Sequence, residues 1–256
     1  MFGAPWRHYA RTDSTNTRAR ELAAAGAPGG TVVTAGEQTA GRGRQGRTWT
    51  APPGGALLYS ALLRPLDDRH MMLPLAVPLA VCEAAEALRP GLECGVKWPN
   101  DVLVDGRKLA GVLIEARPRD GWAVIGVGLN LTITPSEFPD ELRDSATSIW
   151  PETPPAQAGS AVSYGPIGAL SNSGTGLLAE RAARLLNARL AAWVQAEAGD
   201  VLAAWRQRDA LVGREIAWEG GAGVADGVDE RGFLLVRLAD GDRVALGAGE
   251  VHLTRL

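Results

Sequence analysis

An arginine- and glycine-rich segment at residues 41–47 limits the folds open to this chain. Its sequence, Gly-Arg-Gly-Arg-Gln-Gly-Arg, places three guanidinium groups on a backbone that can fold tightly around an anion. By letter it matches the dinucleotide-binding pattern G-x-G-x-x-G, and it matches the P-loop pattern with Arg47 in place of the lysine. Both patterns require a helix after the loop, but Pro52-Pro53-Gly54-Gly55 follows and prevents helical propagation. We therefore exclude both folds, which leaves a phosphate-handling loop or a solvated or RNA-contacting Arg/Gly loop.

The composition is that of an ordinary globular protein. The 256 residues are 46% hydrophobic, which is enough for one large core and a small second one. A net charge of −3 argues against a general nucleic-acid binder, which would present a basic face. No run approaches the roughly 18 apolar residues of a membrane span, and the charged N-terminus lacks the apolar core of a secretory signal. We expect a cytoplasmic protein with no membrane partner.

Cysteines and histidines offer no obvious catalytic or metal site. Cys82 and Cys94 cannot complete a four-ligand zinc site, and Cys82 lies in an apolar helical pattern typical of a buried reduced thiol rather than of a disulfide. His8, His70 and His252 are scattered, and no G-x-S-x-G elbow is present. If the chain is an enzyme, we expect a substrate to supply the nucleophile.

The hydrophobic pattern predicts an α+β protein. We expect strands at residues 31–35, 56–64 and 122–131, and helices at residues 17–25, 73–88, 177–198 and 201–211. Short strands between glycine turns within residues 215–246 predict a small separate β-barrel. The stretch 151–176, rich in Pro, Ser and Gly, is expected to be a mobile loop. The chain is thus predicted to form one domain over residues 1–210 and another over residues 211–256.

A second motif, Lys97-Trp98-Pro99-Asn100-Asp101, begins a predicted hairpin that turns at Asp105-Gly106. The turn is expected to bring Lys97, Asn100 and Lys108 within reach of one another. On the other interpretation, the lysines are edge-strand charges that oppose aggregation.

Two further segments also allow two interpretations. Ser14-Thr15-Asn16 precedes a short helix and is typical of an N-cap. Gly126 and Gly128 interrupt the strand at 122–131, which indicates a bulge, a ligand that approaches the backbone closely, or tight packing against a neighbour.

Five motifs in this order resemble the biotin protein ligases, which include the biotin–acetyl-CoA-carboxylase ligases and the holocarboxylase synthetases. They are Asp-Ser-Thr-Asn (13–16), Glu-Gln-Thr-Ala-Gly-Arg-Gly-Arg-Gln-Gly-Arg (37–47), Lys-Trp-Pro-Asn-Asp (97–101), Gly-Arg-Lys-Leu-Ala-Gly-Val-Leu (106–113) and Gly-Val-Gly-Leu-Asn (126–130). The resemblance covers residues 12–149. It implies a mixed β-sheet packed with helices, as in the class II synthetase-like catalytic domain of biotin and lipoate ligases, followed by a small SH3-like β-barrel.

The resemblance also implies an activity. Such enzymes use ATP and Mg²⁺ to convert biotin to biotinyl-5′-adenylate and then transfer the biotinyl group to a lysine of a biotin carboxyl carrier protein. Only twelve residues precede Asp13, which is too few for a DNA-binding module, so the chain resembles the monofunctional type that does not bind DNA. A monomer and a homodimer both remain open, and the Mg²⁺ ligands stay unknown, with Asp101 as the nearest candidate by motif position.

The roles of individual residues follow from the same resemblance. The implied biotin contacts are Ser14, Thr15, Asn16, Gln38, Arg42, Gly43, Arg44, Lys108 and Gly111. The implied nucleotide contacts are Arg44, Arg47, Trp49, Lys97, Asn100, Asp101 and Asn130. The implied catalytic cations are Lys108, Arg44 and Arg42.

These residue types fit the chemistry of biotin. A buried ureido group needs both donors and acceptors, and the carboxylate needs cations. A lipoate or octanoate ligase of the same fold and a non-enzymatic sensor of biotin or RNA remain as alternatives.

Overall fold

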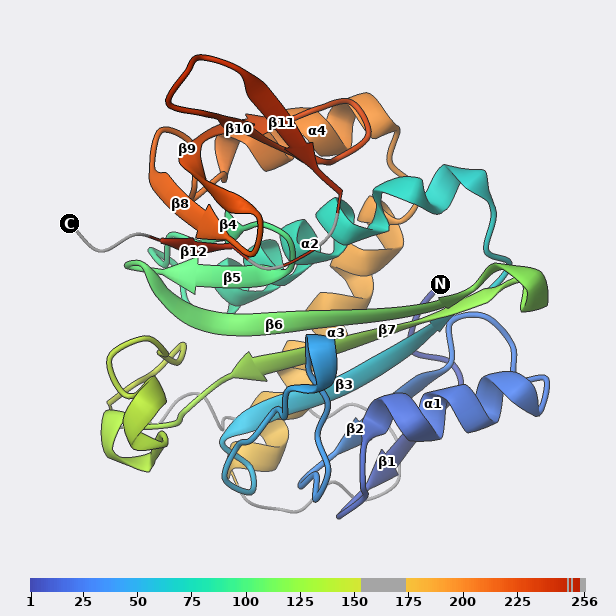
Figure 1. Ribbon diagram of the computed structural model, residues 1–256. Coiled ribbons are helices and arrows are strands. Elements are labelled where there is room, and N and C mark those ends of the chain that lie inside the picture. Colours follow the sequence, from blue (N-terminus) through green and yellow to red (C-terminus); the bar gives the residue numbers. More distant parts are fainter. Residues whose placement is uncertain (153–173, 248, 250, 254–256) are drawn as a thin grey trace.

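The computed structural model describes residues 1–152, 174–247, 249 and 251–253 (Figure 1). The predicted loop at 151–176 lies outside these residues except at its two ends. Within the described part, a large mixed sheet, a smaller antiparallel sheet and four α-helices surround one main hydrophobic core.

The large sheet has seven strands in the order β1-β2-β3-β7-β6-β5-β4. Their bounds are β1 Trp6–Tyr9, β2 Val32–Ala35, β3 Ala56–Leu63, β4 Gly95–Lys97, β5 Asp101–Val104, β6 Arg107–Arg117 and β7 Trp122–Asn130. Only β1 and β2 pair in parallel, and the other neighbours are antiparallel. The predicted strands and the hairpin at Asp105-Gly106 are confirmed, whereas β1 was not expected from the sequence.

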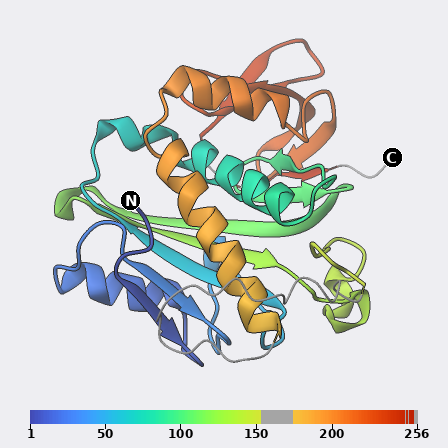
Figure 2. The ribbon, with the colours of Figure 1, turned by 180° about the vertical axis from the view of Figure 1, so that it is seen from behind.

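The large sheet carries helices on both faces. On one face, α1 (Thr15–Ala24) packs against β2, β3 and β7. On the other face, α2 (Leu73–Leu88) lies beside α3 (Gly174–Trp193), and α3 crosses the sheet diagonally (Figure 2). The fourth helix, α4 (Ala198–Gln207), packs against α2 and β9. The helix predicted at 73–88 is confirmed, and the bounds of the other three differ from prediction by a few residues.

Successive residues of β7 point to opposite faces of the large sheet, one facing the main core and the other facing the site. Along β7, Ile125, Val127 and Leu129 point into the main core under α2 and α3. The residues between them, Gly126 and Gly128, are therefore on the face that carries α1. This second face has two glycines where side chains would otherwise stand, which leaves room for Asn16 and Trp49 above the middle of the sheet.

One apolar helical stretch passes a length and composition test for a membrane span. Residues Asp68–Leu88 form 21 helical residues, and the most apolar 18-residue window among them has a mean hydropathy of 1.6, so the expectation that no run approaches this length is wrong. In its most apolar window 72% is buried inside the protein, which identifies it as a core helix. No other such helix is present in the described ranges.

The expected small β domain is an antiparallel sheet ordered β11-β10-β9-β8-β12 (Figure 1). Its strands are β8 Glu215–Trp218, β9 Gly221–Val228, β10 Leu234–Arg237, β11 Arg243–Leu246 and β12 His252–Leu253. No pairing closes it into a barrel among the described strands. Its buried Ile216, Leu234 and Val236 belong to the same core as α2, so its interior is not separate. The domain boundary at 210/211 stays a prediction.

The segment before the small sheet covers the edge of the large one. The Val96 N–H donates to Arg208 O (2.7 Å), and the Ala210 N–H donates to Val96 O (2.9 Å). The edge strand β4 is thereby paired rather than open.

Candidate active site

A cavity of about 1030 Å³ opens on the face of the large sheet that carries α1. All the residues implied as site residues by the sequence line it: Ser14, Thr15, Asn16, Gln38, Arg42, Gly43, Arg44, Arg47, Trp49, Lys97, Asn100, Asp101, Lys108, Gly111 and Asn130. The structure therefore brings the five motifs together, although their individual roles stay predictions.

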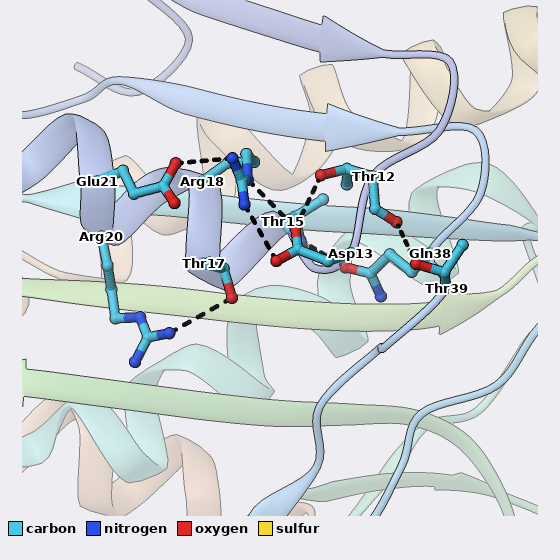
Figure 3. Close-up of polar contacts among 9 residues, drawn as sticks. All are labelled: Thr12, Asp13, Thr15, Thr17, Arg18, Arg20, Glu21, Gln38 and Thr39. Atoms are coloured by element: carbon cyan, nitrogen blue, oxygen red, sulfur yellow. Dashed lines mark hydrogen bonds and ion pairs between the residues drawn. The ribbon is translucent and has the colours of Figure 1, made fainter.

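One end of the cavity is a polar network at the start of α1. Gln38 Oε1 accepts hydrogen bonds from Thr15 N (2.7 Å) and from Thr15 Oγ1 (3.0 Å) (Figure 3). Beneath them the buried Ser60 hydroxyl lies 2.8 Å from Thr15 Oγ1 and 2.6 Å from Asn16 Oδ1. The network fixes hydroxyl and amide groups that can both donate and accept hydrogen bonds.

Backbone pairing joins the first two motifs. The Ala40 N–H donates to Asp13 O (2.9 Å), and the Thr12 N–H donates to Glu37 O (3.1 Å). The Arg18 side chain bridges Asp13 (3.0 Å) and Glu21 (2.9 Å) on the outer side of α1 (Figure 3). These contacts hold the first two motifs, which supply the polar network, in a fixed position relative to each other.

The N-cap interpretation of Ser14 is only partly correct. Ser14 occupies the N-cap position with extended backbone angles, but its side chain makes no capping hydrogen bond. The residue is buried and lines the cavity. Its hydroxyl therefore belongs to the cavity wall and does not cap α1.

The strand glycines are explained by tight packing. A β-carbon at Gly126 would overlap the Asn16 amide, and one at Gly128 would overlap the Trp49 indole. Gly111, which pairs with Gly128 in the sheet, faces Trp49 at 3.0 Å from the position of a β-carbon. The register of β6 with β7 is continuous here, so no bulge is present.

Basic side chains gather in the middle of the cavity. Lys108 Nζ lies 2.7 Å from Asp101 Oδ1, and Arg44 Nη1 donates to Asn100 Oδ1 (3.1 Å). Arg44 also donates to the carbonyl of Gly249 (3.3 Å), which links the Arg/Gly loop to the C-terminal sheet. Six Lys and Arg residues line the cavity but only three Asp and Glu, so the site attracts anions although the chain carries −3 overall.

The Arg/Gly loop has no helix after it, as the prolines predicted. Residues Arg44–Gly46 form a single 3₁₀ turn, with Gln45 at φ 53° and Gly46 at φ 76°, and the chain then reaches β3 without a further helix. The exclusion of the P-loop and dinucleotide folds is confirmed.

Glu115 is a residue that sequence reasoning missed. It accepts from Asn16 Nδ2 (2.8 Å) and forms ion pairs with Arg20 and Arg42, both at 3.2 Å. It thus orients one residue of the polar network and one of the central cations. A charged residue directly after the apolar run 109–114 was the only signal of it in the sequence.

An apolar rim was also missed. Leu58, Phe138 and Ala146 share one small hydrophobic cluster, and Trp49 packs against it. Asn130 fixes the segment that carries Phe138 and Ala146, because its side chain donates to Thr147 O (2.9 Å). The rim comes from segments without any recognisable motif.

No group of three or more His, Cys, Asp or Glu that could hold a metal occurs in the part of the chain that the structure describes. The candidate ligand Asp101 is a single carboxylate, and its Oδ1 already forms an ion pair with Lys108 Nζ at 2.7 Å.

The fold and the cavity define a class of protein. The mixed sheet holds a polar pocket and a cluster of cations, and the strand glycines Gly111, Gly126 and Gly128 (the glycine floor) lie between them. This arrangement is that of a protein that brings a small organic acid and a second anion together.

Comparison with known proteins identifies the family. Residues 9–131 match the model of the biotin/lipoate A/B protein ligase family. A biotin–[acetyl-CoA-carboxylase] ligase of Mycobacterium tuberculosis is 36% identical over 98% of this chain and 91% of its own length. The bifunctional ligase/repressor BirA of Bacillus subtilis is 40% identical over 53% of this chain, and the match spans only 43% of that protein. This chain belongs to the biotin/lipoate A/B protein ligase family.

A solved structure has the same architecture. The biotin protein ligase from Aquifex aeolicus in complex with biotin and ATP matches this structure with a TM-score of 0.73 and 26% sequence identity. The match covers 99% of this chain and 100% of the Aquifex aeolicus chain. The predicted fold class, a helix-packed mixed sheet followed by a small β domain, is confirmed.

Proposed function

We propose that this protein is an ATP-dependent biotin protein ligase. It forms biotinyl-5′-adenylate from biotin and ATP and then transfers the biotinyl group to a lysine of a biotin carboxyl carrier protein. The observation that carries the proposal is the convergence of the polar network and the central cations in one cavity. The names of the relatives and the bound ligands of the Aquifex aeolicus structure support it.

The polar network is the proposed ureido site. A ureido group has one carbonyl acceptor and two N–H donors, and burying it without partners would cost several kcal/mol. The Thr15 hydroxyl, the Gln38 amide and the Asn16 amide supply both kinds of partner. Ser14 adds a hydroxyl that no capping bond occupies.

The glycine floor and Trp49 form the proposed site for the apolar part of biotin. Gly111, Gly126 and Gly128 let Asn16 and Trp49 lie directly against the strand backbone, and the Trp49 indole offers the flat apolar surface for the biotin ring and alkyl chain. Trp49 Nε1 is buried without a partner among the described residues, so its N–H is free to bind a ligand.

Lys108, Arg44 and Arg42 are the proposed catalytic cations. The biotin carboxylate attacks the α-phosphorus of ATP, so two anions must be held in contact, and catalysis is positioning plus charge stabilisation. Lys108 is held by Asp101 and Arg42 by Glu115, which aims both cations before the substrates arrive. No proton needs to be removed from an ionised carboxylate, which agrees with the absence of a histidine from the cavity lining.

The apolar rim with Asn100 and Asn130 is the proposed nucleoside site. The rim residues Leu58, Phe138 and Ala146 line the cavity and offer an apolar surface for a planar base. Mg²⁺, when bound, would neutralise part of the triphosphate charge, and Asp101 is the carboxylate of this chain that we propose as its ligand.

We further propose that the protein is cytoplasmic, binds neither DNA nor membranes, and acts as a monomer or homodimer.

Incubation of the purified protein with ATP, Mg²⁺, biotin and a biotin carboxyl carrier domain tests the proposal. Mass spectrometry should show one added biotinyl group on the carrier and AMP as the co-product. Modification in parallel reactions with lipoate or octanoate, but not with biotin, would identify the other ligase activity of the fold. Biotin binding without any product would identify a sensor.

A further inference from the structure

One wall of the cavity is formed by residues that belong to none of the sequence motifs. Gly213, Arg214 and Glu215, at the start of β8, line it from the small C-terminal sheet. The backbone here is fixed, because the Gly213 N–H donates to Ala225 O (2.8 Å) and the Ala225 N–H donates to Arg214 O (2.9 Å). Arg214 is therefore anchored to strand β9 on both sides of its α-carbon.

The Arg214 guanidinium is not held by the side chain or backbone of any other described residue. Within the described part of the chain, no hydrogen bond or ion pair of its side chain is present, not even with the adjacent Glu215. Lys108, Arg42 and Arg44, by contrast, are each held by Asp101, Glu115 or Asn100. A fixed backbone with an unpaired, exposed cation on a cavity wall is suited to an anion that arrives with a ligand.

The proposed reaction, on which this inference rests, needs such an anion site. From the α-phosphorus of ATP the nucleoside extends in one direction and the β- and γ-phosphates in another. The apolar rim suits the base, and the central cations suit the carboxylate and the α-phosphate. We propose that Arg214 binds the β- and γ-phosphates of ATP and holds the pyrophosphate leaving group.

The role is a positioning and charge-stabilising one. As the bond from the biotin carboxylate oxygen to the α-phosphorus forms, the bond from that phosphorus to the bridging oxygen breaks, and its electron pair goes to pyrophosphate. Arg214 donates N–H bonds to these oxygens and offsets the added charge.

The experiment compares Arg214→Ala, Arg214→Lys and the control Arg237→Ala, an exposed arginine of the same sheet that does not line the cavity. Calorimetric titrations with α,β-methylene-ATP and with AMP are made with and without saturating biotin. The Ala variant should bind the ATP analogue about 10-fold more weakly, because a charge-assisted bond is lost, and should bind AMP and biotin as the wild type does. The Lys variant should recover part of the loss, and the control should lose nothing.

Three other binding results would overturn the assignment of Arg214 to the β- and γ-phosphates. Equal loss of AMP and the ATP analogue in Arg214→Ala would assign Arg214 a structural role and overturn the inference. Unchanged binding of the analogue would overturn it as well, while wild-type biotin-dependent exchange of pyrophosphate into ATP would leave the proposed function intact. Failure of the wild type to bind the analogue would overturn both.

Discussion

At the scale of single residues, the site depends on side chains that are held by other side chains. Asn16 contacts Ser60 and Glu115, and it fits only because residue 126 has no β-carbon. Glu115 in turn binds Arg42, so the polar network and the cations share one carboxylate. The substitution of either partner is expected to affect both ends of the cavity.

Gly126→Ala tests the polar network. The added methyl group must displace the Asn16 amide, so we expect the KM for biotin to rise by about 10-fold through loss of roughly 1.5 kcal/mol of hydrogen bonding. Gly199→Ala is the matched control, because nothing lies within 4 Å of a β-carbon there. An unchanged KM for biotin in Gly126→Ala would show that Asn16 does not contact the substrate.

Lys108→Ala tests the catalytic cations. Loss of one well-placed cation should cost about 3 kcal/mol in the barrier, which is on the order of a hundredfold in rate. Biotin-dependent exchange of labelled pyrophosphate into ATP measures this step. Arg107→Ala, one residue away and outside the cavity lining, should keep full exchange. Normal exchange in Lys108→Ala would refute the assignment.

At the scale of elements, turn chemistry explains what could be predicted. Asp105 and Gly106 both have positive φ values, 51° and 73°, as a two-residue hairpin turn of the primed type requires, so the Asp-Gly pair located β5 and β6 correctly. Strand β1 could not be found in this way. Its four residues include Arg7 and His8, and it becomes a strand only by pairing with β2 after α1.

The segment that covers β4 contains a half-buried acid, Asp209. Asp209 Oδ1 accepts from Leu211 N (2.8 Å), while Oδ2 is buried without a partner in the described structure. Burial raises the pKa of Asp209 above its ordinary 3.8. Between that value and the raised pKa, the folded protein keeps a proton that the unfolded chain releases, so the free energy of unfolding falls as the pH rises.

Asp209→Asn removes this dependence and keeps the acceptor. We expect the decrease in Tm from about pH 4 to pH 8 to be smaller in the variant than in the wild type, as calorimetry would measure. Asp120→Asn, at an exposed site, serves as the control. An identical pH profile in Asp209→Asn and wild type would contradict the argument.

At the scale of the whole molecule, the two sheets are coupled through shared core residues and through side-chain hydrogen bonds. Trp98, in the same motif as Asn100, donates from Nε1 to the carbonyl of Gly232 in the turn between β9 and β10 of the small sheet (3.1 Å). Sequence reasoning located each sheet but not this coupling, nor the cavity wall at Arg214, because both join segments more than 100 residues apart.

Trp98→Phe removes this hydrogen bond but keeps an aromatic ring. We expect the free energy of unfolding to fall by about 1 kcal/mol, with a single transition seen both by far-UV circular dichroism and by hydrogen exchange of β9 amides. Separate transitions for the two probes would show that the small sheet folds independently.

The central claim is that one cavity holds the acid group of biotin against the α-phosphate of ATP. A crystal structure with biotin and α,β-methylene-ATP measures this directly. The account predicts the ureido group beside Thr15 and Gln38, and the carboxylate and α-phosphate within hydrogen-bonding distance of Lys108 and Arg44. A structure with biotin and the nucleotide in separate cavities, or with neither ligand near Lys108, would contradict it.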